Sequence, residues 1–182
     1  MEWLWNLDQR VLEMINRGWH SSADDALFAA LTVLGLGWLQ VLLFLPLLFM
    51  KRFRVCGVVC LAAWSVSGIL THIFKEMSLR LRPGNLPDTI LAPDERIFMS
   101  GFPSGHTTTA FAVAVALALC WPGKRRRLVG FIAILLAIGV ALSRVYRGVH
   151  WPTDVLGGAA LGFACAAIAH LLLSARPKGE SA

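Results

Sequence analysis

Three short segments of the chain place polar and ionisable residues where long apolar runs end or begin. The first is K-x6-R-P at residues 75–83, the second is G-F-P-S-G-H at residues 101–106, and the third is S-R-x5-H-x3-D at residues 143–154. Charged residues at membrane depth are costly and are retained there mostly for binding or catalysis. Each segment is therefore a candidate functional site.

The first segment favours an anion as its ligand. Lys75 and Arg82 bring two cations to the end of an apolar run, and a guanidinium binds a phosphate group through two parallel hydrogen bonds. Such cations also serve as interfacial anchors, with their stems along apolar surface and their charges in water. Taken alone, this segment leaves both interpretations open.

The second segment also favours an anion. Glycines and a proline just before a helix predict a tight loop with outward-facing N–H groups, and the positive end of the helix adds to their attraction for anions. Ser104 contributes a hydroxyl donor, and His106, near the start of the helix, is placed to exchange a proton. A lone histidine is more often structural, so a structural role for His106 is the alternative.

The third segment pairs a histidine with a carboxylate. Pro152 suits the first turn of a helix, so we expect His150 just before that helix and Asp154 one turn into it. At this separation the carboxylate can accept a hydrogen bond from the imidazole and fix its tautomer. The other ring nitrogen then faces the site as a nucleophile. The alternative is an interfacial histidine capped by an acid.

Composition indicates a single membrane domain. The 182 residues are 57% hydrophobic and 15% charged, whereas soluble domains average about 45–50% apolar and about 25% charged. The net charge of +6 does not indicate a nucleic-acid partner, because the basic residues form short clusters between the apolar runs. No carboxylate cluster or C-x-x-C pair is present, so we expect no metal and no other cofactor. The cysteines are expected to be small core residues: Cys56, Cys60, Cys120 and Cys165.

The predicted fold is an all-α integral membrane bundle of about five transmembrane helices. Residues 1–23 form an amphipathic interfacial helix, residues 24–175 the membrane domain and residues 176–182 a short cytoplasmic tail. On the first helix the apolar side is Leu4, Leu7, Val11, Ile15 and Trp19. The spans are expected near residues 26–50, 55–79, 104–121, 128–146 and 152–173, with Gly35, Gly37 and Pro46 as candidate bends in the first.

The basic clusters predict the orientation in the membrane. Residues 51–54, residues 124–127 and the tail with Arg176 and Lys178 fall on one side if five spans are counted, and that side should be cytoplasmic. The three candidate segments then face the opposite side.

In this order and at these spacings, the three segments resemble the signature of the type 2 phosphatidic acid phosphatase superfamily, K-x6-R-P, P-S-G-H and S-R-x5-H-x3-D. The resemblance covers about residues 24–173, and every signature position is filled. Longer members of that family carry a full N-terminal span where this chain has an amphipathic helix. The resemblance implies a multi-pass membrane enzyme that removes phosphate from a membrane lipid without a metal ion. The lipid and the bilayer are then the expected partners, with no obligatory protein partner.

The family's residue roles carry over to the matching positions. His150 attacks phosphorus to form a phosphohistidine, Asp154 orients it, and His106 protonates the departing oxygen. The phosphate oxygens are held by Lys75, Arg82, Ser104, Gly105 and Arg144. Just outside the signature, Arg80 and Arg147 are accessory candidates that would suit a diphosphate, with headgroup contact as the alternative. The acids of the long loop, Asp88, Asp94 and Glu95, are expected to be solvated.

Several substrates and two other functions fit the same pattern. The short chain, the outward-facing site and the extra arginines favour undecaprenyl diphosphate. Phosphatidate or phosphatidylglycerol phosphate is the main alternative, and lipid A the third. A haloperoxidase would use similar residues but is expected to be soluble, and a channel or transporter would need ionisable residues through mid-membrane. The expected location is a bacterial inner membrane with the site on the periplasmic face.

Overall fold

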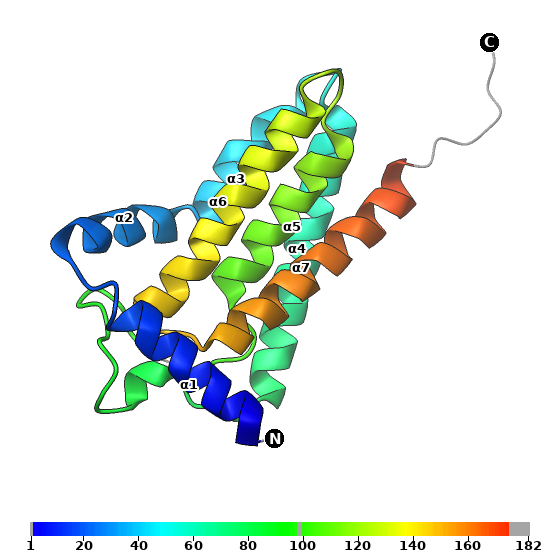
Figure 1. Ribbon diagram of the computed structural model, residues 1–182. Helices are drawn as coiled ribbons and strands as arrows, with labels where there is room; N and C mark the ends of the chain where they lie inside the picture. The colour runs from blue at the N-terminus through cyan, green and yellow to red at the C-terminus, as the bar shows by residue number, and fades with distance from the viewer. Residues whose placement is uncertain (1, 98–99, 175–182) are drawn as a thin grey trace, which may run out of the picture.

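The computed structural model describes residues 2–97 and 100–174, and this part of the chain is helical without any strand. The all-α prediction is confirmed. The helices in chain order are α1 (Glu2–Asn16), α2 (Ser22–Val33), α3 (Gly37–Phe44), α4 (Arg54–Met77), α5 (Gly105–Cys120), α6 (Arg126–Tyr146) and α7 (Pro152–Ser174), with short 3₁₀ helices at Leu45–Leu48 and Pro83–Asn85 (Figure 1).

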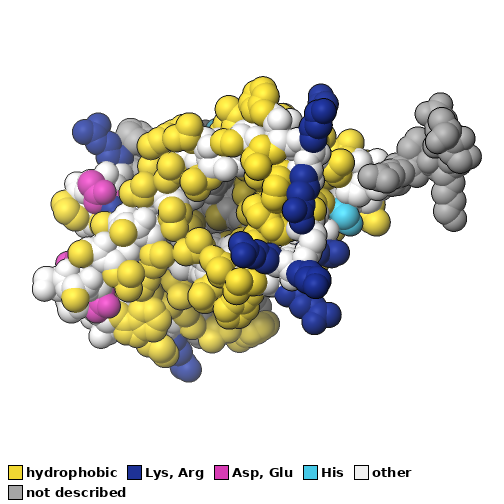
Figure 2. Space-filling view, turned by 90° about the horizontal axis from the view of Figure 1, so that it is seen from above, with side chains coloured by type: hydrophobic (Ala, Val, Ile, Leu, Met, Phe, Trp, Pro, Cys, Tyr) yellow, Lys and Arg dark blue, Asp and Glu magenta, His cyan; other side chains and the backbone are white. Residues whose placement is uncertain are grey.

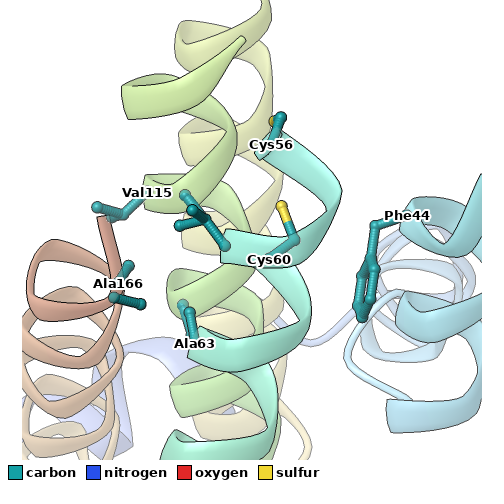
Figure 3. Close-up of a cluster of buried hydrophobic side chains, with 10 residues drawn as sticks. Phe44, Cys56, Cys60, Ala63, Val115 and Ala166 are labelled. Carbon is teal, nitrogen blue, oxygen red and sulfur yellow. The ribbon is translucent and has the colours of Figure 1, made fainter. Parts of the chain in front are cut away.

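Helix α5 is the centre of the bundle and packs against α4, α6 and α7. The main core cluster consists of small side chains from these helices together with Phe44, and Figure 3 shows Cys56 and Cys60 of α4 within it. Cys56, Cys60 and Cys165 are buried free thiols, as predicted, while Cys120 is half-buried. Small residues allow the helices to approach closely, which is how helices associate in lipid.

Two glycines of α7 allow this helix to pack closely on α5. A Cβ on Gly162 would lie 2.2 Å from the carbonyl oxygen of Thr108 on α5, and a Cβ on Gly158 would lie 2.8 Å from that of Ser104. The two residues form a G-x-x-x-G pair, a spacing of small residues that is common where helices pack closely in a membrane. Because Asp154 lies one turn before Gly158, the same contact brings the carboxylate of the third segment to the loop that opens α5.

The first predicted span, at residues 26–50, is broken near two of its candidate bends, Gly35 and Gly37. Helix α2 and the α3 segment are bent by 62° at a break of a few residues, and α2 runs sideways from the bundle in Figure 1. The break includes Gly35, where a Cβ would lie 2.6 Å from the His106 ring, so the backbone there packs directly on the second segment.

Three single helices, α4, α6 and α7, are long and apolar enough to cross a membrane, and the bent pair makes a fourth if it is one span. Helix α5 has 16 residues and is shorter than these three. The total of five spans therefore stays a prediction.

The two ends of the bundle differ in chemistry. The loops that precede α4 and α6 share one end, where the rings of Phe53 and Trp121 lie 4.8 Å apart. Figure 2 shows lysine and arginine side chains around this end. Residues 51–54 and 124–127 belong to these loops and the helix starts that follow them, so the two basic clusters share one end of the bundle. The predicted tail, residues 176–182, lies outside the described residues.

Helix α1 crosses the opposite end of the bundle and packs on α6 and α7. Its buried side consists of Asp8, Leu12, Ile15 and Asn16. The Asn16 amide donates to the carbonyl oxygens of Ile90 and Tyr146, at 2.8 and 2.6 Å. Large apolar residues stay exposed on its other sides: Trp3, Leu4, Trp5, Leu7 and Met14. A helix is confirmed at Glu2–Asn16, which ends before Trp19, but its two buried polar residues were not predicted. The position of this helix in the membrane interface stays a prediction.

Candidate active site

The three segments come together at the end of the bundle that α1 covers. Lys75 lies at the end of α4, and Arg82 lies in the loop that follows it. Ser104 and His106 lie at the start of α5. Arg144 lies at the end of α6, and Asp154 lies at the start of α7. Helix ends from four elements thus meet around His150, which lies between α6 and α7.

A glycine in the left-handed backbone conformation places His150 at the end of the bundle that α1 covers. Gly148 has φ +73° and directly follows the last turn of α6, and the N–H groups of Val149 and His150 both donate to the Arg144 carbonyl at 3.2 Å. A glycine with positive φ is the usual way to end a helix with a sharp turn. Pro152 then starts α7.

His150 and Asp154 form a buried pair, with side chains 3% and 0% exposed. Nδ1 of His150 lies 3.4 Å from Oδ2 of Asp154, as the spacing predicts. Asp154 is held by Trp151, whose backbone N–H donates to Oδ2 at 3.0 Å, the reach-back of a carboxylate in the first helical turn. The carboxylate is therefore fixed before any ligand binds.

Electrostatics keeps His150 neutral. Burial lowers the pKa of its imidazole well below the usual value, and the positive charges of Arg82, Arg144 and Lys75 lower it further. Burial also lowers the pKa of Arg82, with the charge of Arg144 adding to the effect. A neutral imidazole beside several cations is the protonation state that a nucleophile requires.

Lys75 and Ser104 are positioned by backbone and hydroxyl groups. The Lys75 ammonium donates to the carbonyl oxygen of Ser100 at 3.1 Å. Ser104 is fully buried, and its hydroxyl oxygen accepts a hydrogen bond from Thr107 at 3.0 Å. The carbonyl of Asp154 accepts from the Ser104 N–H at 3.0 Å, which joins the second and third segments directly.

Arg144 is paired with a carboxylate that sequence reasoning missed. Its Nη1 and Nη2 donate to the two carboxylate oxygens of Glu95 at 2.7 and 3.1 Å, and Nη1 also contacts the hydroxyl of Thr32. The guanidinium is 4% exposed, and its Nε is buried with no hydrogen-bond partner in the described part of the chain. A bidentate carboxylate occupies the geometry that a phosphate would take on this arginine.

Glu95 also binds Arg147, so one carboxylate bridges two guanidiniums. Nε of Arg147 donates to it at 2.9 Å, and Nη2 of the same side chain contacts Asp94. Burial alone would raise the pKa of Glu95, but the hydrogen bonds and charges of Arg144 and Arg147 outweigh it and hold the pKa at about 2. The expectation of solvated loop acids is wrong for Glu95, whose side chain is 16% exposed, and holds for Asp88 at 87%.

Arg80 is engaged as well. Its Nη1 donates to Oδ1 of Asp154 at 2.9 Å and to Thr153 at 2.7 Å, and its Nη2 contacts Asp8 of α1. Both accessory arginines of the sequence analysis therefore face carboxylates of the chain itself. Their partners lie far away along the chain, so no local pattern could have identified them.

A cavity of about 570 Å³ adjoins the site on the side of α3, α4 and α5. Lys75, Gly105 and His106 line its end nearest the site, and Gly35, Trp64 and Ile69 are among its other walls. The cavity is thus apolar for much of its length and cationic at one end. No group of three potential metal ligands occurs among the described residues.

Comparison with known proteins agrees with this arrangement. The model of the PAP2 superfamily matches residues 53–178. The undecaprenyl-diphosphatase of Sulfolobus acidocaldarius is 35% identical over 118 residues, which are 64% of this chain and 54% of that protein. Phosphatidylglycerophosphatase B of Bacillus subtilis is 32% identical over 149 residues, 79% of this chain and 66% of that protein. The chain therefore spans between about half and two thirds of the length of these relatives.

A solved structure shares the fold. LpxE from Aquifex aeolicus superposes with a TM-score of 0.78 at 27% identity, covering 90% of this chain and 94% of that one. The apolar helices and these relatives together identify a membrane protein. Because the family model matches well over half of the chain and includes all three segments, the chain belongs to the PAP2 superfamily.

Proposed function

We propose that this protein is a membrane lipid phosphatase that works through a phosphohistidine at His150. The observation that carries the proposal is the neutral, buried His150, held by Asp154 and surrounded by Lys75, Arg82 and Arg144, beside an apolar cavity. Fixed cations around a nucleophile are what phosphoryl transfer requires, because its catalysis is mostly positioning and charge stabilisation.

In the first step the free ring nitrogen of His150 attacks phosphorus. A P–N bond forms to the terminal phosphorus, and the bond from that phosphorus to the bridging oxygen of a diphosphate, or to the ester oxygen of a monophosphate, breaks while His106 donates a proton to the departing oxygen. His150 becomes positively charged as the P–N bond forms, and Asp154 stabilises this charge through Nδ1. Lys75, Arg82, Arg144, the Ser104 hydroxyl and the Gly105 N–H hold the remaining phosphate oxygens.

In the second step water attacks the phosphorus of the phosphohistidine. His106, now deprotonated, takes a proton from that water, the P–N bond breaks, and inorganic phosphate leaves. Both steps balance without a redox partner. The cations of this site carry the charge that a divalent ion carries in other phosphatases, so we propose that activity is independent of added metal.

Substrate binding must move Glu95. Its carboxylate holds both guanidinium nitrogens that a phosphate would need on Arg144. The buried Nε of Arg144 has no partner among the described residues, and an additional phosphate oxygen would supply one. Exchange of one anion for another keeps the guanidinium paired throughout, so the exchange avoids an isolated buried charge.

The lipid portion is proposed to lie in the cavity beside Lys75 and His106. His106 lines its cationic end, so the departing oxygen of a lipid seated there would face the proton donor. The apolar walls suit a hydrocarbon chain. A bulky side chain at Gly68, another lining residue, should slow turnover of long-chain lipids and spare short water-soluble phosphate esters.

Undecaprenyl diphosphate is the substrate that we propose first, and the similarity to the undecaprenyl-diphosphatase of Sulfolobus acidocaldarius supports it. The extra charge of Arg80 and Arg147 no longer favours a diphosphate, because both side chains are paired with carboxylates. Phosphatidylglycerol phosphate is the second candidate, supported by the relative from Bacillus subtilis that spans more of this chain. Lipid A is the third.

The membrane arrangement is part of the proposal. Residues 1–23 would lie in the interface, residues 24–175 would form the membrane domain, and residues 176–182 would be cytoplasmic. The site would face the periplasm from the inner membrane, with the basic loops on the cytoplasmic side.

The test is phosphate release by the purified protein in detergent with EDTA, with undecaprenyl diphosphate, phosphatidate, phosphatidylglycerol phosphate and lipid A compared in parallel. EDTA-resistant release that is fastest with undecaprenyl diphosphate is the expected result. A different fastest lipid would replace the substrate and keep the mechanism. No release from any lipid, or release that needs a divalent metal, would overturn the proposal.

A further inference from the structure

Three side chains with alternating charges, Asp8, Arg80 and Asp154, connect α1 to the proposed nucleophile. Asp8 of α1 contacts Nη2 of Arg80, Nη1 of Arg80 donates to Oδ1 of Asp154 at 2.9 Å, and Oδ2 of Asp154 lies 3.4 Å from Nδ1 of His150. The row crosses three elements that are remote in sequence: α1, the loop after α4 and the start of α7.

Asp8 is the outer end of this row and yet is 2% exposed. Besides Arg80, it accepts hydrogen bonds from the backbone N–H of Thr153 at 2.9 Å and from its hydroxyl at 2.5 Å. A buried carboxylate is costly unless it is paired and hydrogen-bonded. The Asp8 side chain meets both conditions. Of its two partners, Arg80 donates a hydrogen bond to Asp154, and Thr153 precedes Asp154 in the chain.

The charge of Arg80 has two opposite effects on the site. Its hydrogen bond orients Asp154, but its positive charge opposes the positive charge that His150 acquires during attack. The carboxylate of Asp8 offsets that charge at short range, in a region with little water to screen it. Asp154 then keeps both its orientation and its negative charge toward His150.

We propose that Asp8 is a positioning residue for the reaction, acting through Arg80 and Thr153 on Asp154; this inference rests on the proposed phosphatase function. Helix α1 is on this account part of the active site and not only a membrane contact. Asp8 touches neither the phosphate cations nor the cavity, so its effect falls on turnover and not on substrate binding.

The competing explanation is that Asp8 merely docks α1. Other residues of α1 already hold the helix on the bundle. Leu12 and Ile15 are buried against it, and the Asn16 amide donates hydrogen bonds to two backbone carbonyls. Leu12→Ala therefore loosens the same helix without changing any charge. Glu13→Gln removes the same charge from an exposed position of the same helix.

The experiment measures kcat and KM for Asp8→Asn, Leu12→Ala and Glu13→Gln with the fastest lipid of the panel above. Asp8→Asn is expected to lower kcat on the order of ten-fold with KM nearly unchanged, in line with the cost of removing a partner of a catalytic side chain. Glu13→Gln should match the unmodified protein. Leu12→Ala should lower the thermal midpoint more than kcat.

A double-mutant cycle separates the charge effect from docking. Arg80→Gln alone leaves two buried carboxylates near each other, and Asp8→Asn alone removes one of the two carboxylates that offset the charge of Arg80. The double variant restores the net charge of the row, so its kcat should exceed that of either single variant. Additive losses, or an Asp8→Asn variant as active as Glu13→Gln, would overturn the inference. An inactive unmodified protein would instead overturn the proposed function, so the two failures are distinguishable.

Discussion

At the scale of single residues, carboxylates of the chain itself pair with arginines in and beside the proposed phosphate site. Glu95 pairs with Arg144 and Arg147, and Arg80 pairs with Asp8 and Asp154. Without a substrate, the guanidiniums would otherwise repel one another in a buried space. The charge of Arg144 is therefore balanced from within, and a phosphate that binds there competes with Glu95.

Glu95→Gln is expected to strengthen inhibition by vanadate, an oxyanion shaped like phosphate. The variant keeps the size of the side chain but removes the charge that competes for Arg144, so the inhibition constant should fall on the order of ten-fold, about 1.4 kcal/mol. Asp88→Asn is the matched control, because it removes a charge from the same loop at a side chain that is 87% exposed. Equal inhibition constants for both variants would show that Glu95 does not compete.

The same side chain should make stability depend on pH. The pKa of Glu95 is about 2 in the folded protein, below its usual value of 4.5. A depressed carboxyl pKa contributes stability above the unfolded pKa, and that contribution is lost as pH falls from about 4.5 toward 2. Glu95→Gln should thus lower the thermal midpoint at pH 7, with the difference from the unmodified protein shrinking below pH 4.5. A constant difference across this range would contradict the assignment.

Sequence patterns predicted the local part of this site and missed the distant part. The four-residue spacing of His150 and Asp154, with Pro152 between them, is a short-range relationship that fixes geometry within one turn. Asp8 and its partner Arg80 are 72 positions apart in the sequence, and Glu95 is 49 and 52 positions from Arg144 and Arg147. Such pairs are decided by how helices pack, which a single sequence does not reveal.

At the scale of elements, the pair α5 and α7 positions the site. Ser104 and Asp154 begin these two helices and are joined by a backbone hydrogen bond, and the glycines of α7 let the helices approach below that bond. A G-x-x-x-G spacing is typical of such a contact. The break between α2 and α3 was predicted only as a candidate bend, because glycine permits a bend without specifying its angle.

Gly162→Ala is expected to destabilise the protein by about 1–3 kcal/mol, the usual cost of overpacking. The added methyl group would lie 2.2 Å from a backbone oxygen of α5, which cannot move as a side-chain tip could. The matched control is Gly68→Ala in α4, where no atom lies within 4 Å of the added group. Thermal unfolding in detergent measures both. Equal thermal midpoints for the two variants would mean that α5 and α7 can move apart at Gly162 without loss of stability.

At the scale of the whole molecule, the bundle has a basic end and a reactive end. The loops at residues 51–54 and 124–127 lie at one end, and α1 with the three segments lies at the other. An amphipathic α1 with exposed tryptophans suits the membrane interface, where aromatic rings are enriched. The orientation of the bundle in the membrane is inferred only from the basic residues of its loops, so it remains a prediction.

Single cysteines introduced by Asp88→Cys and Lys124→Cys, in a variant without the four native cysteines, test the orientation. A membrane-impermeant maleimide added to intact cells should label the first and not the second, because Asp88 is at the reactive end and Lys124 at the basic end. Permeabilised cells, in which both should react, are the control. Labelling of Lys124→Cys alone in intact cells would reverse the orientation.

The central claim is that His150 carries the phosphoryl group during turnover, and trapping that group tests it most directly. The protein is mixed with substrate labelled with ³²P in its terminal phosphate, quenched within milliseconds, and the label on the protein is followed at acid and alkaline pH. We expect a protein-bound label that is released by acid, survives alkali, lies on the peptide containing His150 and is absent from His150→Gln. Phosphate release with a stoichiometric burst but a label on another residue, or steady turnover by His150→Gln, would contradict the account.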